Sequence, residues 1–182
     1  RNAFMHNYNL SVDGGGEKGH YAFSASYFGQ EGTIIGSDYQ RLTLRLNSDV
    51  KLFKWLTLGE HLSFVNSSGR NAMNNSSSPG ASVISAALAM APWDPTYYPK
   101  GSTNAAGDDL SGRTAASSNF KNVVNPFSMV NESFPQDKTQ RWVGDVYLSI
   151  EPVKGLTIRP SISMDTYLTR HRLFKNQYEN ST

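Results

Sequence analysis

Residues 41 to 50, RLTLRLNSDV, alternate between apolar and polar side chains, and no other feature of the sequence constrains the fold as strongly. A period of two predicts a β-strand whose two faces differ. Leu42, Leu44 and Leu46 fall on one face. The other face carries Arg41, Thr43, Arg45, Asn47 and Asp49. Because that second face is densely charged, it must contact water or a polar partner rather than a second apolar sheet.

The same alternation recurs in residues 4–13, 21–27, 56–64, 141–150 and 156–165. Two of these segments are irregular. Glu60 interrupts the apolar face of the fourth segment, and Pro160 lies inside the last one. Proline cannot donate to a strand ladder, so a bulge or a break is expected at Pro160. The pattern predicts an all-β chain of about six antiparallel, up-and-down strands.

The connections between these segments alternate in length. A glycine-rich stretch, residues 52–54 and residues 152–155 form short turns, whereas residues 67–138 form a long loop. Short turns at one end and long loops at the other are typical of outer-membrane β-barrels. The chain of 182 residues has no cysteine and a net charge of +2, with scattered basic residues. This excludes disulfides and gives no basic field for nucleic acid. No apolar run is long enough for a transmembrane helix.

The glycine-rich stretch VDGGGEKGHY matches a dinucleotide-binding motif at Gly14, Gly16 and Gly19. Such a motif needs a helix that begins within it, because the free N–H groups of the helix hold the phosphates. Here the following residues, HYAFSASYF, alternate at period two and predict a strand. We therefore expect a β-hairpin whose glycines adopt positive φ, with Glu17 and Lys18 at its tip.

No group of residues has the spacing in the sequence that is typical of a catalytic or metal-binding site. The four histidines, His6, His20, His61 and His171, lack a ligand spacing with one another or with a carboxylate on one face. Asp108 and Asp109 lack the alternating carboxylates of a calcium loop. We expect no cofactor, no metal and no enzymatic activity.

The long loop contains a stretch of good helix formers, residues 81–91, that follows Ser76–Gly80 and ends at Pro92. Its aromatic residues either pack the loop against itself or stack on a ligand such as a sugar ring. They are Trp93, Tyr97, Tyr98, Phe120 and Phe127. A second aromatic group is either an interfacial girdle of a barrel or ordinary core. It consists of Tyr8, Tyr21, Phe23, Tyr27, Trp55 and Trp142.

Residues 6–59 resemble the barrel region of SusC/RagA-type TonB-dependent transporters of Bacteroidetes. In that family a strand ending in S-x-x-G-G precedes Y-x-x-S-x-x-Y, then Q-E-G-x-I-x-G-S-D-Y-x-R and R-x-N-x-D. The matching residues are Ser11, Gly14, Gly15, Tyr21, Ser24, Tyr27, Gln30, Glu31, Gly32, Ile34, Gly36, Ser37, Asp38, Tyr39, Arg41, Arg45, Asn47 and Asp49. Residues 125–168 are similar to the next loop and strand pair of the family.

The resemblance implies that residues 1–182 form part of a transmembrane β-barrel, with one long, partly helical extracellular loop and without the plug domain of the family. Family members import oligosaccharides or peptides across the outer membrane, with a SusD-like surface lipoprotein and the TonB complex as partners. Leu42, Leu44 and Leu46 would then contact lipid. The lumen-facing residues would be Arg41, Thr43, Arg45, Asn47, Asp49, Asp145 and Arg159. The expected contacts with substrate or lipoprotein are Trp93, Asp94, Tyr97 and Tyr98.

One alternative belongs to another class: a soluble or surface-anchored β-sandwich that binds carbohydrate. It accounts for the strands and the aromatic residues. It does not account for the charged faces or for the alternation of short and long connections.

Overall fold

The structure is a computed structural model that describes residues 2–70, 82–117 and 123–176. The chain divides into two compact units. The sheet unit comprises Arg1–Glu31, Asp38–Gly69 and Asp137–Arg170, and the loop unit comprises Gly32–Ser37, Arg70–Gln136 and His171–Thr182. Ser76–Gly80 and Phe120 lie outside the described residues.

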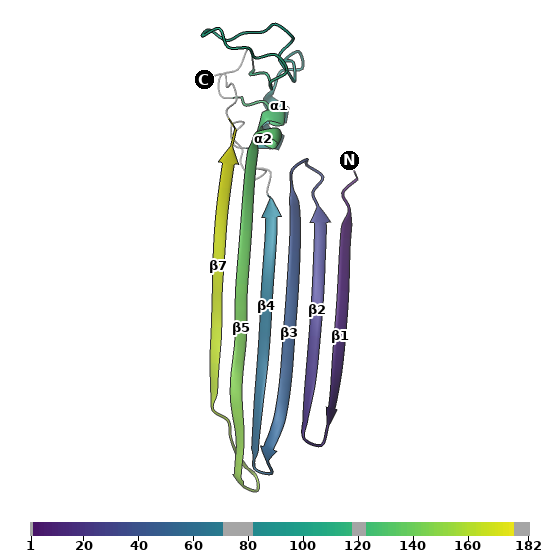
Figure 1. Cartoon of the computed structure of the whole chain (residues 1–182), viewed down its shortest axis with the longest axis vertical. Helices are drawn as coiled ribbons and strands as arrows, with labels where there is room; N and C mark the ends of the chain where they lie inside the picture. The colour runs from purple at the N-terminus through teal and green to yellow at the C-terminus, as the bar shows by residue number, and fades with distance from the viewer. Residues whose placement is uncertain (1, 71–81, 118–122, 177–182) are drawn as a thin grey trace. The chain divides into compact units, whose positions relative to one another are not determined.

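The sheet follows the order of the chain. Its strands are β1 (Met5–Gly16), β2 (Gly19–Glu31), β3 (Asp38–Phe53), β4 (Leu56–Arg70), β5 (Ser133–Val153), β6 (Leu156–Ile158) and β7 (Ser161–Lys175). Neighbours pair in the order β1-β2-β3-β4-β5-β6, and β7 pairs with β5 (Figure 1). The registers are antiparallel for β1–β2, β2–β3, β4–β5 and β5–β6. The predicted up-and-down antiparallel fold is confirmed.

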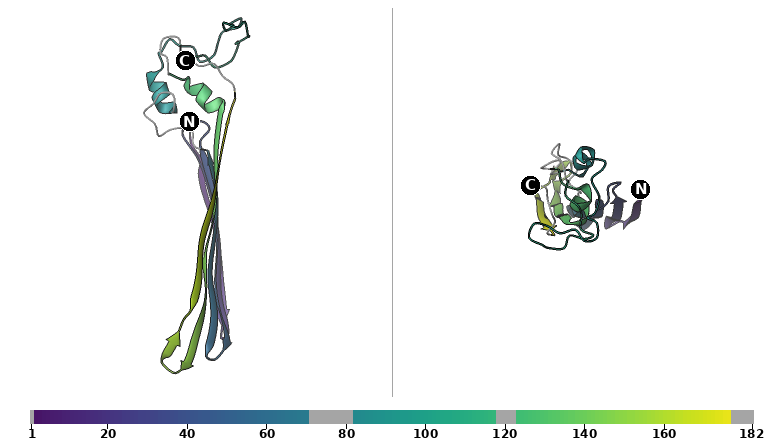
Figure 2. Two further views of the ribbon diagram at one scale, coloured as in Figure 1. Left: turned by 90° about the vertical axis from the view of Figure 1, so that its left-hand side faces the viewer. Right: turned by 90° about the horizontal axis from the view of Figure 1, so that it is seen from above.

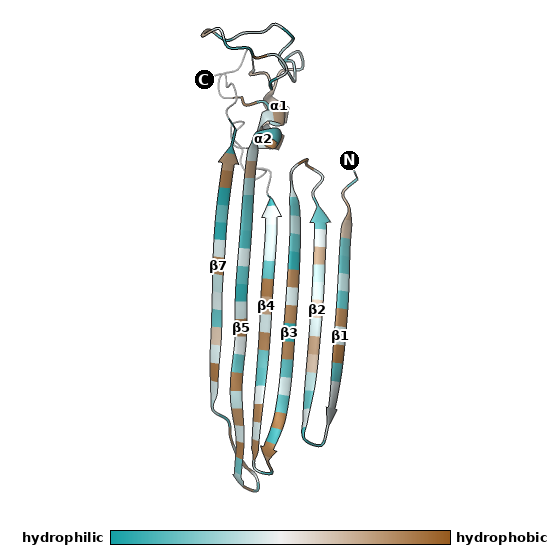
Figure 3. Ribbon diagram, viewed as in Figure 1, coloured by the Kyte–Doolittle hydropathy of each residue, from teal (hydrophilic) through white to brown (hydrophobic). Residues whose placement is uncertain are grey.

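The strand registers preserve the alternation of the sequence. Across β2 and β3, Phe23 pairs with Leu46 and Ala25 with Leu44, while Ser24 pairs with Arg45. Apolar residues therefore meet apolar residues on one face, and polar residues meet polar residues on the other. Figure 3 shows the resulting bands of alternating hydropathy along the strands. We call these the apolar face and the polar face of the sheet unit.

Both irregular positions of the sequence have a structural counterpart. The expected break at Pro160 is present, since β6 ends at Ile158 and β7 begins at Ser161. The Pro160 carbonyl still accepts a hydrogen bond from Leu148 N at 3.0 Å. Glu60 lies on the apolar face, where it accepts a hydrogen bond from Ser48 Oγ of β3 at 3.2 Å.

The apolar face of the sheet has no hydrophobic core behind it. The buried hydrophobic residues of the described chain are Val83, Ala86, Ala91, Leu110, Ala115, Val123, Val124 and Met129, all in the loop unit. Large side chains on the apolar face remain accessible instead, with Leu10 63% and Trp142 52% exposed. Viewed edge-on in Figure 2, the strands form a single twisted layer.

The glycine-rich stretch forms the expected hairpin, but the expected reason for its glycines is wrong. The positive-φ glycines of the described residues are Gly36, Gly101, Gly107, Gly112 and Gly155, none of which lies in this hairpin. Gly16 pairs with Gly19, so only Glu17 and Lys18 form the turn. A Cβ atom on Gly14 would overlap the Tyr21 ring, and one on Gly19 would overlap the Asp49 carbonyl of β3. These two glycines serve close packing between strands.

The loop unit has its own small core. It contains α1 (Val83–Ala89), which falls within the predicted helical stretch, and α2 (Pro126–Asn131), which was not predicted. Val83, Ala86, Val124 and Met129 pack together, with Ile34 and Val130 against them. Neither described helix has the length and hydropathy that a membrane-spanning helix requires.

Ile34 reaches this core through the tight 32–37 connection. Ser37 N donates to the Ile34 carbonyl at 3.3 Å, and Ser37 Oγ donates to the same oxygen at 2.7 Å. Gly36 adopts φ of +81°, a left-handed conformation that glycine tolerates best. The G-x-I-x-G-S part of the family motif thus forms a tight turn that places Ile34 against the core of the loop unit.

We predict that Gly19→Ala destabilises the full-length protein by about 1–3 kcal/mol, because the new methyl group meets backbone that cannot rotate away. Gly16→Ala, in the same hairpin, is the matched control, since a Cβ there has no atom within 4 Å. Denaturant unfolding in detergent micelles measures both. Equal unfolding midpoints for the two variants would show that the packing at Gly19 is unimportant.

Candidate functional site

The polar face brings most of the predicted lumen residues together. Arg41, Thr43, Arg45, Asn47 and Asp49 alternate along it in β3. Asp145 of β5 joins Arg45 and Asn47 around one hollow on this face. Arg159, between β6 and β7, places its guanidinium 3.6 Å from the centre of the Tyr147 ring. Arg45, Asn47 and Asp145 therefore line one hollow and Arg159 contacts Tyr147, while the assignment to a lumen stays a prediction.

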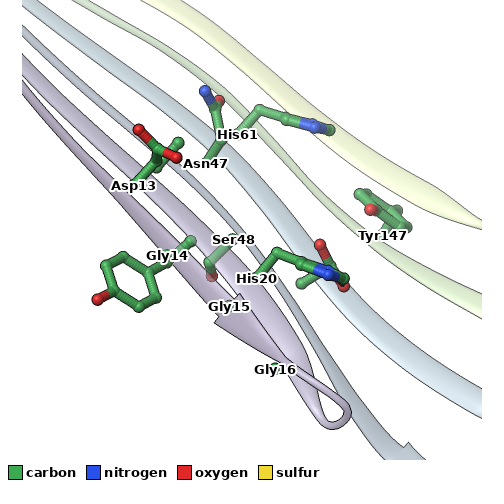
Figure 4. Close-up of a pocket in the computed structure, with 12 residues that line it drawn as sticks. Asp13, Gly14, Gly15, Gly16, His20, Asn47, Ser48, His61 and Tyr147 are labelled. Atoms are coloured by element: carbon green, nitrogen blue, oxygen red, sulfur yellow. Dashed lines mark hydrogen bonds and ion pairs between the residues drawn. The ribbon is translucent and has the colours of Figure 1, made fainter.

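A second hollow lies near the turns that join β1 to β2 and β3 to β4. It has a volume of about 550 Å³. Its lining includes Asp13, His20, Asn47, Asp49, His61 and Tyr147. Figure 4 shows Asp13, Asn47 and His61 on the same side of the strands. We call this the turn-end hollow.

Two histidine–aspartate pairs flank the turn-end hollow, and each joins two neighbouring strands. His20 Nδ1 lies 3.4 Å from Asp49 Oδ2, between β2 and β3. His61 Nδ1 lies 3.2 Å from both carboxylate oxygens of Asp145, between β4 and β5. Each pair is a directly opposed cross-strand pair in its ladder. The sequence hid these contacts, because only the strand register brings such distant residues together.

Tyr147 forms the centre of a stack on this face. The His61 ring lies 5.5 Å from the Tyr147 ring at an interplanar angle of 24°, and Arg159 packs on Tyr147 as well. Tyr147 pairs with Gly59, where a Cβ atom would overlap the ring. A glycine beneath the ring therefore lets Tyr147 lie flat over β4.

An ion pair joins β5 to β7 on the polar face. Arg141 Nε and Nη2 donate to the two oxygens of Asp165 at 3.0 and 2.6 Å. This bidentate geometry aligns a planar guanidinium with a carboxylate. Within the described ranges, no group of three histidine, aspartate or glutamate side chains is arranged to hold a metal ion.

The predicted contact residues of the loop unit have different surroundings. Trp93 is 71% exposed and Tyr97 is 46% exposed. Tyr97 also packs against Phe127, with ring centroids 6.2 Å apart. By contrast, Asp94 accepts a hydrogen bond from Ser117 Oγ at 2.8 Å, and Tyr98 Oη accepts one from Ala116 N at 3.1 Å. Trp93 and Tyr97 thus present rings to solvent, whereas Asp94 and Tyr98 also hold the loop together.

Residues 97–114 form a small hairpin with bridges between Tyr97 and Thr114 and between Thr103 and Asp109. Asn104 Nδ2 donates to Asp108 at 2.9 Å, so this carboxylate is engaged within the turn. Hydrogen bonds from the Ser111 side chain and backbone lower the pKa of Asp109. Asp108 and Asp109 thus both have local structural roles.

Asn125 is buried and its side chain hydrogen-bonds three segments of the loop unit, a role that was not predicted from the sequence. Its Nδ2 donates to the carbonyls of Thr96 at 3.0 Å and Ala115 at 2.8 Å. Its Oδ1 accepts from Phe127 N at 2.9 Å and so caps α2. One side chain thereby ties three segments together beside the Tyr97–Phe127 pair. Asparagine immediately before a proline is a helix-start signal that could have revealed the cap.

No family model matches the chain. TonB-dependent receptor P3 of Formosa agariphila is 26% identical over 175 residues, which cover 93% of this chain and 16% of that protein. TonB-dependent receptor P39 of the same organism is 37% identical over 54 residues, which cover 30% of this chain and 5% of that protein. The chain therefore spans a small part of the length of the relatives it matches. Both relatives are TonB-dependent receptors by name.

Two solved structures share the fold. The RagAB peptide importer in its closed-closed state matches with a TM-score of 0.63 at 20% identity, over 95% of this chain and 19% of that chain. A structure of the RagAB peptide transporter matches with a TM-score of 0.61 at 20% identity, over 92% and 18%. Together with the relatives, they confirm the resemblance to SusC/RagA-type TonB-dependent receptors.

We predict that Asn125→Ala destabilises the loop unit locally by about 1–3 kcal/mol, because the buried Ala115 carbonyl loses its donor, the Thr96 carbonyl keeps only the bond from Ala115 N, and α2 loses its cap. Asn131→Ala at the exposed end of the same helix is the control. Hydrogen exchange should become faster at Phe127 and Tyr98 in the first variant alone. Unchanged exchange in Asn125→Ala would show that these hydrogen bonds are not needed.

Proposed function

We propose that this chain forms part of the barrel wall of a TonB-dependent outer-membrane transporter, with the apolar face towards lipid and the polar face towards the lumen. The observation that supports this most directly is the exposed apolar face, because the described residues of the sheet unit contribute no buried hydrophobic side chain. Water is a poor solvent for such a face, whereas hydrocarbon is a suitable one.

The height of the apolar face is compatible with a membrane. From Leu56 to Phe64, β4 advances eight residues, or about 27 Å at roughly 3.4 Å per residue. With a barrel tilt of about 40°, this corresponds to about 21 Å along the membrane normal, close to the roughly 25 Å apolar band of outer-membrane barrels.

Aromatic pairs lie near both ends of this stretch of β4. Phe64 and Trp142 pack with ring centroids 4.2 Å apart at one end, and Phe53 and Trp55 stack at 5.5 Å near the β3–β4 turn. Aromatic side chains with an apolar body favour the interface between lipid and water. This arrangement favours the girdle interpretation over an ordinary core for Trp55 and Trp142.

The alternative β-sandwich requires a second layer against the apolar face. The described sheet is a single layer, and its other face carries the Arg141–Asp165 pair and both histidine–aspartate pairs. A charged face of this kind suits a water-filled lumen.

The finer parts of the proposal concern cargo and partners. We infer that the loop unit lies outside the cell and that Trp93 and Tyr97 contact an oligosaccharide or peptide, or a SusD-like lipoprotein. The two structural neighbours are a peptide importer and a peptide transporter, and this likeness of fold favours a peptide as the cargo. Asp94 and Tyr98 would support the contact surface. Energy would come through TonB.

Leu44→Arg and Thr43→Arg test the assignment of the faces. Leu44→Arg should lower the stability of the membrane-inserted protein by about 2–4 kcal/mol, because a cation would face hydrocarbon. Thr43→Arg should be tolerated, because its side chain would remain in water. Folding into lipid vesicles, followed by heat-modifiable mobility in gels, measures the difference. Equal tolerance of the two arginines would argue against a membrane-facing apolar face.

Trp93→Ala and Tyr97→Ala test the contact surface. Each should lower uptake by cells several-fold, since stacking of a ligand on an aromatic ring contributes about 1 kcal/mol or more. Glu17→Gln at the hairpin tip is the control and should leave uptake unchanged. Surface levels of all variants are measured in parallel. Normal uptake with normal surface levels would remove both rings from the site.

A further inference from the structure

Two basic residues of the sheet unit, Lys138 of β5 and Arg170 of β7, lie directly opposite each other. The hydroxyls of the adjacent Thr139 and Thr169 lie 3.2 Å apart across the two strands. The backbone hydrogen bond from β5 to the Pro160 carbonyl fits the same antiparallel alignment. One step along each strand from the threonine contact therefore places the two cations on opposed Cα atoms, which are about 5 Å apart in such a ladder. We call Lys138 and Arg170 the basic pair.

The basic pair lies on the apolar side of the sheet. Lys138 is four residues from Trp142 on β5, and Arg170 is six residues from Met164 on β7. Residues an even number apart on a strand share a face. Trp142 and Met164 line one hollow of the apolar face together with Leu44. The basic pair is thus continuous with the apolar face rather than with the polar one.

Neither cation has an anionic partner within the described residues. Lys138 and Arg170 are both exposed and make no ion pair there. The adjacent Asp137 points to the polar side, by the same alternation. The carboxylates at this end of the apolar side, Glu31 and Asp38, belong to β2 and β3, and β4 lies between β3 and β5. Like charges that face each other across a ladder destabilise it, so an anion from outside the sheet unit would stabilise the basic pair.

The basic pair also lies at the height of lipid headgroups. From Trp142 to Lys138, β5 advances four residues, or about 14 Å at roughly 3.4 Å per residue. With a barrel tilt of about 40°, this corresponds to about 10 Å along the membrane normal. The headgroup layer is roughly 5–8 Å thick on each side of the hydrocarbon. Because lysine and arginine have long side chains, both cations reach this layer from its water side.

We propose that Lys138 and Arg170 bind the headgroup of an anionic lipid at the membrane surface. Its phosphate lies between the two cations and removes their repulsion, while its acyl chains lie along the apolar face beside Trp142. A lipid is the occupant rather than a free anion, because a charged patch that continues into an apolar surface suits an amphiphile. The site depends on the proposed function, since it requires the apolar face to contact lipid.

Native mass spectrometry of the full-length protein in detergent micelles tests this site. The probes are palmitoyl-oleoyl phosphatidylglycerol, which is anionic, and palmitoyl-oleoyl phosphatidylcholine, which has the same chains and no net charge. We expect the unchanged protein to retain phosphatidylglycerol preferentially. Lys138→Gln and Arg170→Gln should each weaken its binding about fivefold, because each removes one cation near an anionic headgroup. Binding of phosphatidylcholine should not change.

Two further variants separate the effect of charge from that of structure. Lys138→Arg keeps the cation and should retain the preference for phosphatidylglycerol. Lys51→Gln removes a cation from the polar face of β3 and should leave lipid binding unchanged. A fall in phosphatidylglycerol binding that is equal in Lys138→Gln and Lys51→Gln would overturn the site, because it would reflect net charge alone.

Insertion into phosphatidylcholine vesicles, measured by heat-modifiable mobility, tests the proposed function separately. Normal insertion together with equal retention of the two lipids would overturn the lipid site alone. Lack of insertion by the unchanged protein would overturn both. If Lys138→Gln and Arg170→Gln instead lose an acidic partner protein while phosphatidylglycerol binding is unchanged, the assignment to lipid is wrong.

Discussion

Hydrogen bonding between neighbouring strands holds the sheet unit together, and the rest of the structure depends on it. A single layer has no interior in which side chains could be buried, so side-chain packing supplies little of its cohesion. The ladder satisfies the backbone donors and acceptors between strands, which is the requirement that hydrocarbon imposes on any spanning segment. The side chains on each face then decide which solvent that face can contact. In β3 one face carries leucines, which suit an apolar solvent, and the other carries arginines and an aspartate, which suit water.

Period-two patterning predicted the strands and their antiparallel order, and the missing N–H of proline predicted the break at Pro160. These features depend on local geometry, because successive side chains of a strand point to opposite faces whatever the rest of the chain does. The contacts of Glu60 could not be predicted in this way. Its partner Ser48 lies on a different strand, and only the alignment of β3 with β4 brings the hydroxyl within reach.

The same limit explains what was missed at the candidate sites. His20 and Asp49 are separated by 29 residues, and His61 and Asp145 by 84, so their pairing appears only when the register is known. Asn125 carried a local helix-start signal, yet its two bonds to Thr96 and Ala115 are tertiary. The prediction of positive φ for the hairpin glycines was wrong, because Glu17 and Lys18 alone form the turn. Gly14 and Gly19 are required instead by close packing against the neighbouring strands.

Three glycines of the sheet unit lie opposite aromatic rings and so influence the register in which the strands pair. Gly14 lies opposite Tyr21, Gly29 opposite His6 and Gly59 opposite Tyr147, and in each case the ring occupies the space that a Cβ would fill. A slip of two residues would keep every side chain on its proper face but would press the ring onto a substituted carbon. The hydropathy pattern alone permits such a slip, whereas the contact between each ring and its glycine excludes it. The glycines thus specify one strand register among the several that the alternation of apolar and polar residues would permit.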